Sequence, residues 1–224
     1  MSDSSPLSSE EVATYCAAVD WLSGLVSSPE LAAAWADPSA LTRYSTGGVA
    51  AHALLGGVLR LKQLLDEPEP AERRRVGVVE AFAPNRMAGP EDDDPLFAEV
   101  RSRSEQLAER GPQGLLDTCA EAYDALQDAL PQTRADRAVS LLRVPDGQMS
   151  LRDCLRTRVL ELVVHGDDLV ASVPNWAPEP PPDSAVKVCL DVCLELATAR
   201  VGGMGALRSF TRAERAEFDA LRVL

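Results

Sequence analysis

Histidine and aromatic residues are scarce in this sequence, and basic residues are outnumbered by acidic ones. The 224 residues include only two histidines, and aromatic side chains make up 4% of the chain. Lys and Arg number 22 against 35 Asp and Glu, which gives a net charge of −13. Binding to nucleic acids or to anionic membranes requires clustered positive charge. We therefore expect neither a nucleic acid nor a membrane among the partners of this protein.

The sequence also lacks long apolar runs and a disulfide framework. No stretch approaches the roughly 20 apolar residues that a membrane span needs, and residues 1–11 are Ser-rich and acidic, unlike a secretory signal. The five cysteines cannot all pair with one another, and they lie within apolar segments. Both features are typical of reduced thiols in the cytoplasm. Cys189 and Cys193 have the spacing of two ligands on one helical face, but two small core side chains are the simpler interpretation.

Helical periodicity, bounded by capping residues and prolines, is present along most of the chain. Ser8 or Ser9 is the expected cap of a first helix, Thr46 that of a second long one, and Ser150 that of a later one. Residues 138–149 are the one candidate extended segment. The expected helices cover residues 8–28, 29–36, 46–65, 71–82, 94–110, 112–130, 150–173 and 183–200, followed by a last helix with a capping box of Thr211 and Glu214. This pattern predicts an all-α bundle.

A proline-rich run indicates one boundary in the chain. Four of residues 178–182 are proline, which makes this stretch a stiff connector. We expect a helical bundle domain over residues 1–175, and over residues 176–224 the connector with C-terminal helices that pack on the bundle. Residues 84–95 are rich in Pro, Gly and acids and predict a loop. The basic triplet Arg73–Arg75 is most simply a solvated face.

The segment around His165 is the first candidate for chemistry. Glu161 and His165 are four residues apart, so both side chains emerge on one face of the expected helix. Apolar residues surround them almost on every side, which predicts a buried helix. A buried carboxylate needs a partner or a metal ion to offset the loss of its hydration. An imidazole and a carboxylate on adjacent turns can both reach one divalent ion.

A third metal ligand has to come from another helix, and His52 is the only other histidine. It lies in a helix crowded with small residues, and Gly56 and Gly57 follow it although glycine costs about 1 kcal/mol relative to alanine inside a helix. Small residues there indicate a close helix approach or open volume beside the imidazole. Two His and one Glu would leave one position of a tetrahedral ion open, as in catalytic sites. Histidines satisfied by hydrogen bonds in the core remain an alternative.

Four stretches of the sequence resemble one known family. The string Thr157-Arg158-Val159-Leu160-Glu161-Leu162-Val163-Val164-His165-Gly166-Asp167-Asp168 resembles the metal-binding helix of the mycothiol-dependent maleylpyruvate isomerase family. The stretches 35–41 and 47–52 are similar to that family's first-ligand region, and residues 207–215 resemble the tail of its shorter members.

The resemblance implies a fold, a metal and a class of chemistry. The fold is a DinB-like four-helix bundle, here with additional C-terminal helices, and the metal ligands are His52, Glu161 and His165. The ion is divalent, usually zinc, and it activates a low-molecular-weight thiol, mycothiol, for attack on a small electrophile in an isomerase or transferase reaction. The tail lacks a strand-rich second domain, so maleylpyruvate itself is not expected as the substrate. A non-catalytic metal-binding bundle that senses or sequesters a small ligand remains the alternative.

Two further residues are candidates for positions around the metal ligands. Asp168 lies three residues after His165 and either orients that imidazole or is an ordinary exposed acid. Arg158 lies three residues before Glu161 and can pair with it or meet a substrate carboxylate, although a paired structural arginine is the simpler interpretation. The expected partners are therefore a small-molecule thiol and an electrophile. The sequence leaves open whether the chain is a monomer or a homodimer.

Overall fold

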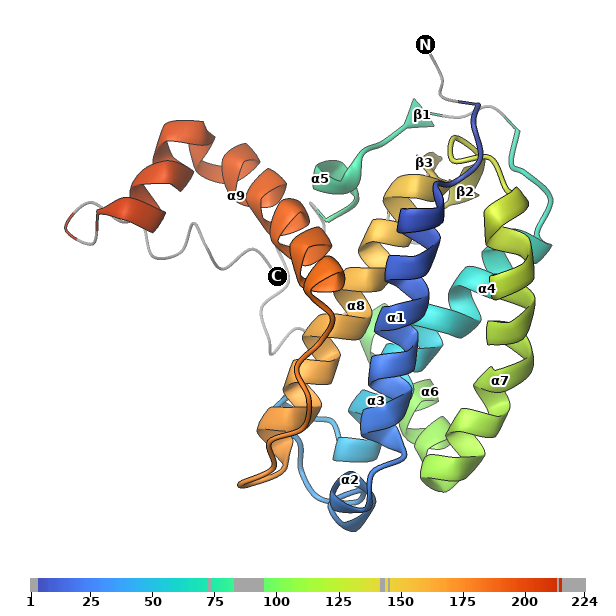
Figure 1. Cartoon of the computed structure of the whole chain (residues 1–224), viewed down its shortest axis with the longest axis vertical. Helices are drawn as coiled ribbons and strands as arrows, with labels where there is room; N and C mark the ends of the chain where they lie inside the picture. Colours follow the sequence, from blue (N-terminus) through green and yellow to red (C-terminus); the bar gives the residue numbers. More distant parts are fainter. Residues whose placement is uncertain are drawn as a thin grey trace.

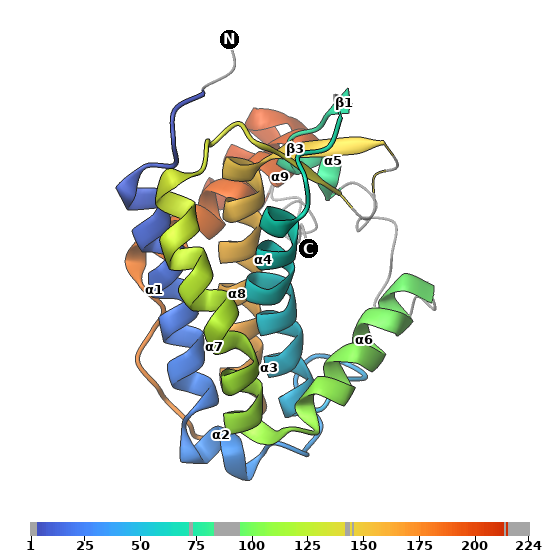
Figure 2. The ribbon, with the colours of Figure 1, turned by 90° about the vertical axis from the view of Figure 1, so that its right-hand side faces the viewer.

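Four long helical segments lie side by side and form the body of the molecule (Figure 1 and Figure 2). They belong to a computed structural model that describes residues 4–71, 74–82, 95–141, 144, 146–212 and 214. The segments are α1 (Ser9–Val26), the continuous run of α3 (Thr46–Leu54), the π-helix η1 (Leu55–Leu59) and α4 (Arg60–Asp66), α7 (Gly111–Ala129) and α8 (Leu151–Ser172). The prediction of an all-α four-helix bundle is confirmed.

One apolar core joins these helices. Their inward side chains are fully buried and include Tyr15 and Leu22 of α1, Leu54 of α3, Leu115 of α7 and Leu162 of α8. Burial of each such side chain contributes about 2 kcal/mol relative to exposure. The core therefore holds α3 against α8, the two helices that carry the histidines.

Side-chain caps set where the bundle helices begin. The hydroxyl of Ser8 accepts a hydrogen bond from the amide of Glu11 at 3.2 Å, and that of Ser150 accepts one from the amide of Asp153 at 3.1 Å. Both positions agree with the sequence prediction. For α3 the prediction was one residue off, because Ser45 rather than Thr46 is the cap and accepts from the amide of Gly48 at 2.9 Å. Each cap of this kind contributes about 1 kcal/mol.

Shorter elements close the two ends of the bundle. They are α2 (Pro29–Ala33), β1 (Arg74–Arg75), α5 (Val78–Ala81), α6 (Pro95–Ala108), η3 (Leu130–Gln132), β2 (Ala138–Ser140) and β3 (Gly147–Ser150). Helix α6 packs against α3. The strands form a small sheet in the order β1-β3-β2, with β1 parallel and β2 antiparallel to β3. The extended segment predicted within 138–149 is thus confirmed.

The prediction of a helix over residues 71–82 is wrong. Its described part consists of strand β1 and the four-residue helix α5. Arg74 and Arg75 pair with Gly147 and Gln148 of β3, and the amide of Val76 donates to the carbonyl of Gln148 at 2.9 Å. These bonds join positions about 70 residues apart, so local periodicity gave no sign of them. Arg73, the expected loop at residues 84–94 and any helix after Glu214 lie outside the described residues.

Helix α9 (Asp183–Thr211) packs across α8 and α1. Residues 173–182 connect it to α8, and the indole nitrogen of Trp21 donates to the carbonyl of Glu179 in this connector at 2.9 Å. At Gly202 the backbone adopts φ 75° and ψ 160°, which kinks the helix close to residue 200, where the sequence predicted its end. Thr211 is the last residue of α9, and its hydroxyl donates to the carbonyl of Leu207. The further helix that Thr211 was expected to cap falls outside the described residues. The division of the chain at residue 175 stays a prediction.

A membrane-spanning helix is not found in the described part of the chain, because none of its helices is both long and apolar enough.

Candidate metal centre

The start of α3 is fixed by a carboxylate from a neighbouring helix. Glu105 of α6 accepts hydrogen bonds from the amide of Ser45 at 2.8 Å and from its hydroxyl at 2.7 Å. A Cβ atom on Gly48 would lie 2.1 Å from Oε1 of Glu105, so only glycine admits this contact. Helix α3 is thereby held in one position, and His52 lies on its second turn.

A π-helical segment follows His52 directly. In a π-helix the backbone is wider than in an α-helix, and such segments are frequent at functional sites. Two side chains from other helices donate to its carbonyl groups: the hydroxyl of Tyr15 to Gly57 at 2.9 Å, and the guanidinium of Arg158 to Gly56 at 3.0 Å. The contacts tie η1 to both α1 and α8 and fix it beside His52.

The two glycines of η1 allow α8 to approach closely. A Cβ atom on Gly57 would lie 2.5 Å from Cδ2 of Leu162, which is too close, and one on Gly56 would lie 3.1 Å from Oε1 of Glu161. Both residues of α8 therefore occupy space that a side chain on η1 would fill. The close helix approach that the sequence indicated for these glycines is therefore found in the structure.

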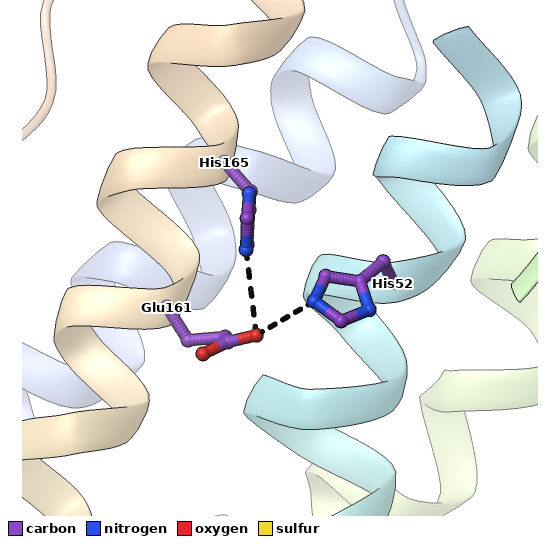
Figure 3. A group of neighbouring side chains, drawn as sticks. All are labelled: His52, Glu161 and His165. Atoms are coloured by element: carbon purple, nitrogen blue, oxygen red, sulfur yellow. Dashed lines mark ion pairs between the residues drawn. The ribbon is translucent and has the colours of Figure 1, made fainter. Parts of the chain in front are cut away.

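The three predicted ligands meet between α3 and α8 (Figure 3). Oε1 of Glu161 lies 3.0 Å from Nε2 of His52 and 3.5 Å from Nε2 of His165. One ligand atom from each of the three residues lies within 4.8 Å of the others, and no second group of this kind occurs among the described residues. Ligand atoms around a tetrahedral zinc ion, at bonds of about 2.0–2.1 Å, are about 3.3 Å apart. The donor set and its spacing fit a divalent ion.

The histidine rings are nearly perpendicular to each other and partly open to solvent. Their centroids are 4.7 Å apart with an interplanar angle of 78°. The side chains of His52, Glu161 and His165 are 19%, 23% and 16% exposed. Tyr44 lies beside this group, with its ring centroid 5.5 Å from that of His52. The cluster therefore lies near the surface of the bundle, with about a fifth of each side chain exposed.

Mutual hydrogen bonds determine the charges in the cluster. Burial alone raises the pKa of Glu161, but hydrogen bonds from His165 and His52 and their positive charge hold it well below its usual range. Burial likewise lowers the pKa of His165, but hydrogen bonds to Asp168 and Glu161 raise it to about 9. The cluster thus keeps Glu161 anionic and, without a metal ion, His165 protonated, so a cation that binds here must displace the proton of His165.

Asp168 holds the ring of His165. Its Oδ2 lies 2.9 Å from Nδ1 of His165, which directs Nε2 of the same ring toward Glu161. Carboxylates commonly orient metal-binding histidines in this way. His52 differs, because its Nδ1 is buried and has no hydrogen-bond partner among the described residues. Arg158 donates to the carbonyl of Gly56 and to the hydroxyl of Thr157, and so helps to hold the π-helix in place.

Several residues near the site could not be found from the sequence. Tyr15 and Glu105 lie tens of residues from either histidine, and Tyr44 lies before the start of α3. No sequence motif connects any of them with a histidine. Only the small residues after His52 gave a local signal, because glycine inside a helix is unfavourable without a packing reason.

Two further arginines of α8 form ion pairs, and the two cysteines of α9 belong to the core. Arg152 pairs with Glu11 at 2.7 Å, and Arg156 pairs with Asp153 and with Glu195. The thiol of Cys189 is buried, and burial raises its pKa to about 12. The alternative interpretation of Cys189 and Cys193, as two small side chains packed in and against the core, agrees with their positions.

Comparison with known proteins gives one match. No curated protein and no solved structure matches the chain. The family model described as mycothiol maleylpyruvate isomerase N-terminal domain matches residues 16–170. This stretch contains all three residues of the cluster and ends before α9. The chain therefore belongs to the family of mycothiol maleylpyruvate isomerase N-terminal domains, whose fold is the DinB-like helical bundle.

Proposed function

We propose that the chain binds one divalent metal ion, zinc, through Nε2 of His52, the carboxylate of Glu161 and Nε2 of His165. The convergence of these three donor atoms within 4.8 Å, from two helices held together by the core, is the observation that carries the proposal. Two imidazoles and one carboxylate are a ligand set that zinc uses in catalytic sites, with a fourth position left for a ligand from solvent.

We further propose that this ligand is a low-molecular-weight thiol, mycothiol, and that the protein adds it to a small electrophile in an isomerase or transferase reaction in the cytoplasm. The family to which the chain belongs supports the choice of thiol. A divalent ion at an open site lowers the pKa of a thiol that approaches it. Glu161 contributes one negative charge to the site, and Asp168 keeps the ring of His165 in place. Tyr44 covers one side of His52.

Metal content is the direct test of the site. In protein purified without a chelator, we expect about one zinc ion per chain, because a preformed three-ligand site binds zinc tightly. Glu161→Ala and His165→Ala are expected to reduce the content to near zero. Glu109→Ala, which removes an exposed carboxylate from the turn after α6, is the matched control and should retain the ion. Equal metal content in wild-type and Glu161→Ala protein would contradict the proposal.

Turnover of a thiol tests the chemistry separately. Metal-loaded wild-type protein is expected to consume mycothiol together with an electrophile, and His165→Ala protein is expected to lose this activity. If zinc is bound and mycothiol raises the melting temperature, but no product forms with any electrophile, the metal site stands and the catalytic proposal fails. That result would favour a bundle that senses or sequesters its ligand.

A further inference from the structure

The large apolar side chains that the described residues expose all lie on α9. Leu190 and Leu194 are 63% and 48% exposed, and Met204, Leu207 and Phe210 are 59%, 51% and 61% exposed. Single exposed apolar residues are ordinary on a protein surface, but their concentration on one element marks an interaction site. We call these five residues the α9 face.

The packing of α9 turns this face away from the bundle. Ala185, Cys189, Val192 and Leu196 are buried in the core, so Leu190 and Leu194 point outward on the other side of the helix. The kink at Gly202 then directs the second half of α9 away from the four-helix bundle, as Figure 1 shows. Both halves of the α9 face are therefore open to a partner.

Charge along α9 changes sign near the kink. Residues 183–198 contain one Lys and three acids, 1 − 3 = −2, whereas residues 199–212 contain three Arg and no acid, which gives +3. A partner that fits this helix must offer apolar side chains with the opposite order of charge. A second α9 running in the antiparallel direction has that order. A parallel copy would place like charges opposite each other.

We propose that the α9 face binds the α9 face of a second copy of this chain, antiparallel about a twofold axis. Such an interface is self-complementary, because each contact occurs twice. It brings Leu190 and Leu194 of one copy to the stretch from Met204 to Phe210 of the other. Arg208 then meets Asp191, which within its own helix pairs with Lys187 at 2.7 Å. A groove beside Leu194 is lined by Val79 and Ala199 and by charged side chains that include Asp191 and Glu195. The proposal does not depend on the metal site.

Sedimentation velocity of the full chain at increasing concentration tests the dimer. We expect wild-type protein to dimerise, and Asp191→Arg and Arg208→Asp each to weaken the dimer about tenfold, since a reversed charge counts twice in a symmetric interface. The double variant exchanges the two charges and is expected to recover most of the affinity. Leu207→Ser, at an exposed position, should weaken the dimer without unfolding the chain.

Arg103→Asp is the matched control, because it reverses an exposed charge on α6 far from the α9 face in sequence. It should leave the dimer unchanged, and circular dichroism should be the same for all variants. Wild-type protein that stays monomeric at every concentration overturns the proposal. A dimer that neither single reversal weakens, or a double variant as weak as the single ones, overturns the antiparallel arrangement.

Discussion

At the scale of single residues, glycines decide how closely α8 lies to the helix of His52. Gly57 is buried in η1, and its missing side chain leaves the space that Leu162 fills. Gly24 in α1 is different, because it is exposed and a Cβ atom there would meet nothing within 4 Å. The same substitution should therefore have opposite effects at the two positions.

We expect Gly57→Ala to lower the free energy of unfolding by roughly 1–3 kcal/mol, because the new methyl group overpacks against a buried leucine. Gly24→Ala should raise it by about 0.5–1 kcal/mol, through the higher helix propensity of alanine. Urea denaturation of both variants at equal metal content measures the two changes. A Gly57→Ala protein as stable as wild type would show that α8 moves away at no cost.

Residue-level reasoning from the sequence selected Glu161, His165 and His52 as one group, and the structure brings these three together. Scarcity made this possible, because two histidines leave only one pair to consider. The contacts of Tyr15 and Arg158 with the π-helix could not be predicted, since they depend on which carbonyl groups face which helix after folding.

At the scale of elements, the N-terminus of α1 is joined to α8 through one carboxylate. Glu11 accepts from the amide of Ser8 at 2.8 Å and from Arg152 of α8 at 2.7 Å. Burial raises the pKa of Glu11, but the hydrogen bonds from Ser8 and Arg152 outweigh this and lower it below its usual range. Because the folded state lowers this pKa, Glu11 stabilises the protein at pH values above the pKa of the unfolded chain. The contribution is lost as pH falls.

Glu11→Gln should therefore destabilise the protein by roughly 1 kcal/mol at neutral pH, a modest amount because the pair is open to solvent. The difference from wild type should shrink as pH falls below about 4.3, the usual pKa of a glutamate, and vanish below the folded-state pKa of Glu11, where both side chains are uncharged. Thermal denaturation at falling pH measures it. Glu10→Gln, on the same helical turn, is the control, and a difference that does not shrink as pH falls would rule out the carboxylate as its origin.

Element boundaries were predictable where local chemistry sets them. Ser8 and Ser150 are caps, Gly111 begins α7 one residue before the predicted start, and the glycines after Arg200 kink α9. The sequence did not reveal η1 or β1. A π-helix has the same residue composition as an α-helix and arises from tertiary packing, while a two-residue strand exists only through its partner.

At the scale of the whole molecule, the proposed metal ion would connect two helices that the core already holds together. Removal of the ion should therefore weaken the bundle without abolishing it. We expect EDTA treatment to lower the melting temperature of wild-type protein, because a ligand that binds only the folded state adds about 4 kcal/mol at a thousandfold excess over its dissociation constant.

Restoring zinc should recover the original melting temperature, whereas Glu161→Ala protein should melt at the same temperature with and without EDTA. Calorimetry measures both. An equal effect of EDTA on wild type and Glu161→Ala would locate the ion elsewhere in the protein.

The π-helix has a consequence for insertions and deletions in this chain. One turn of η1 holds more residues than an α-helical turn, so η1 sets the rotational phase between His52 before it and Leu61 and Leu64 of α4 after it. If all residues of Leu55–Leu59 adopted α-helical geometry instead, the two halves would be rotated relative to each other by about 100°. Either His52 would then leave Glu161, or the two leucines would leave the core. Deletion of one of these residues would restore an α-helix while keeping the phase, but it would remove the widened turn whose carbonyl groups Tyr15 and Arg158 contact.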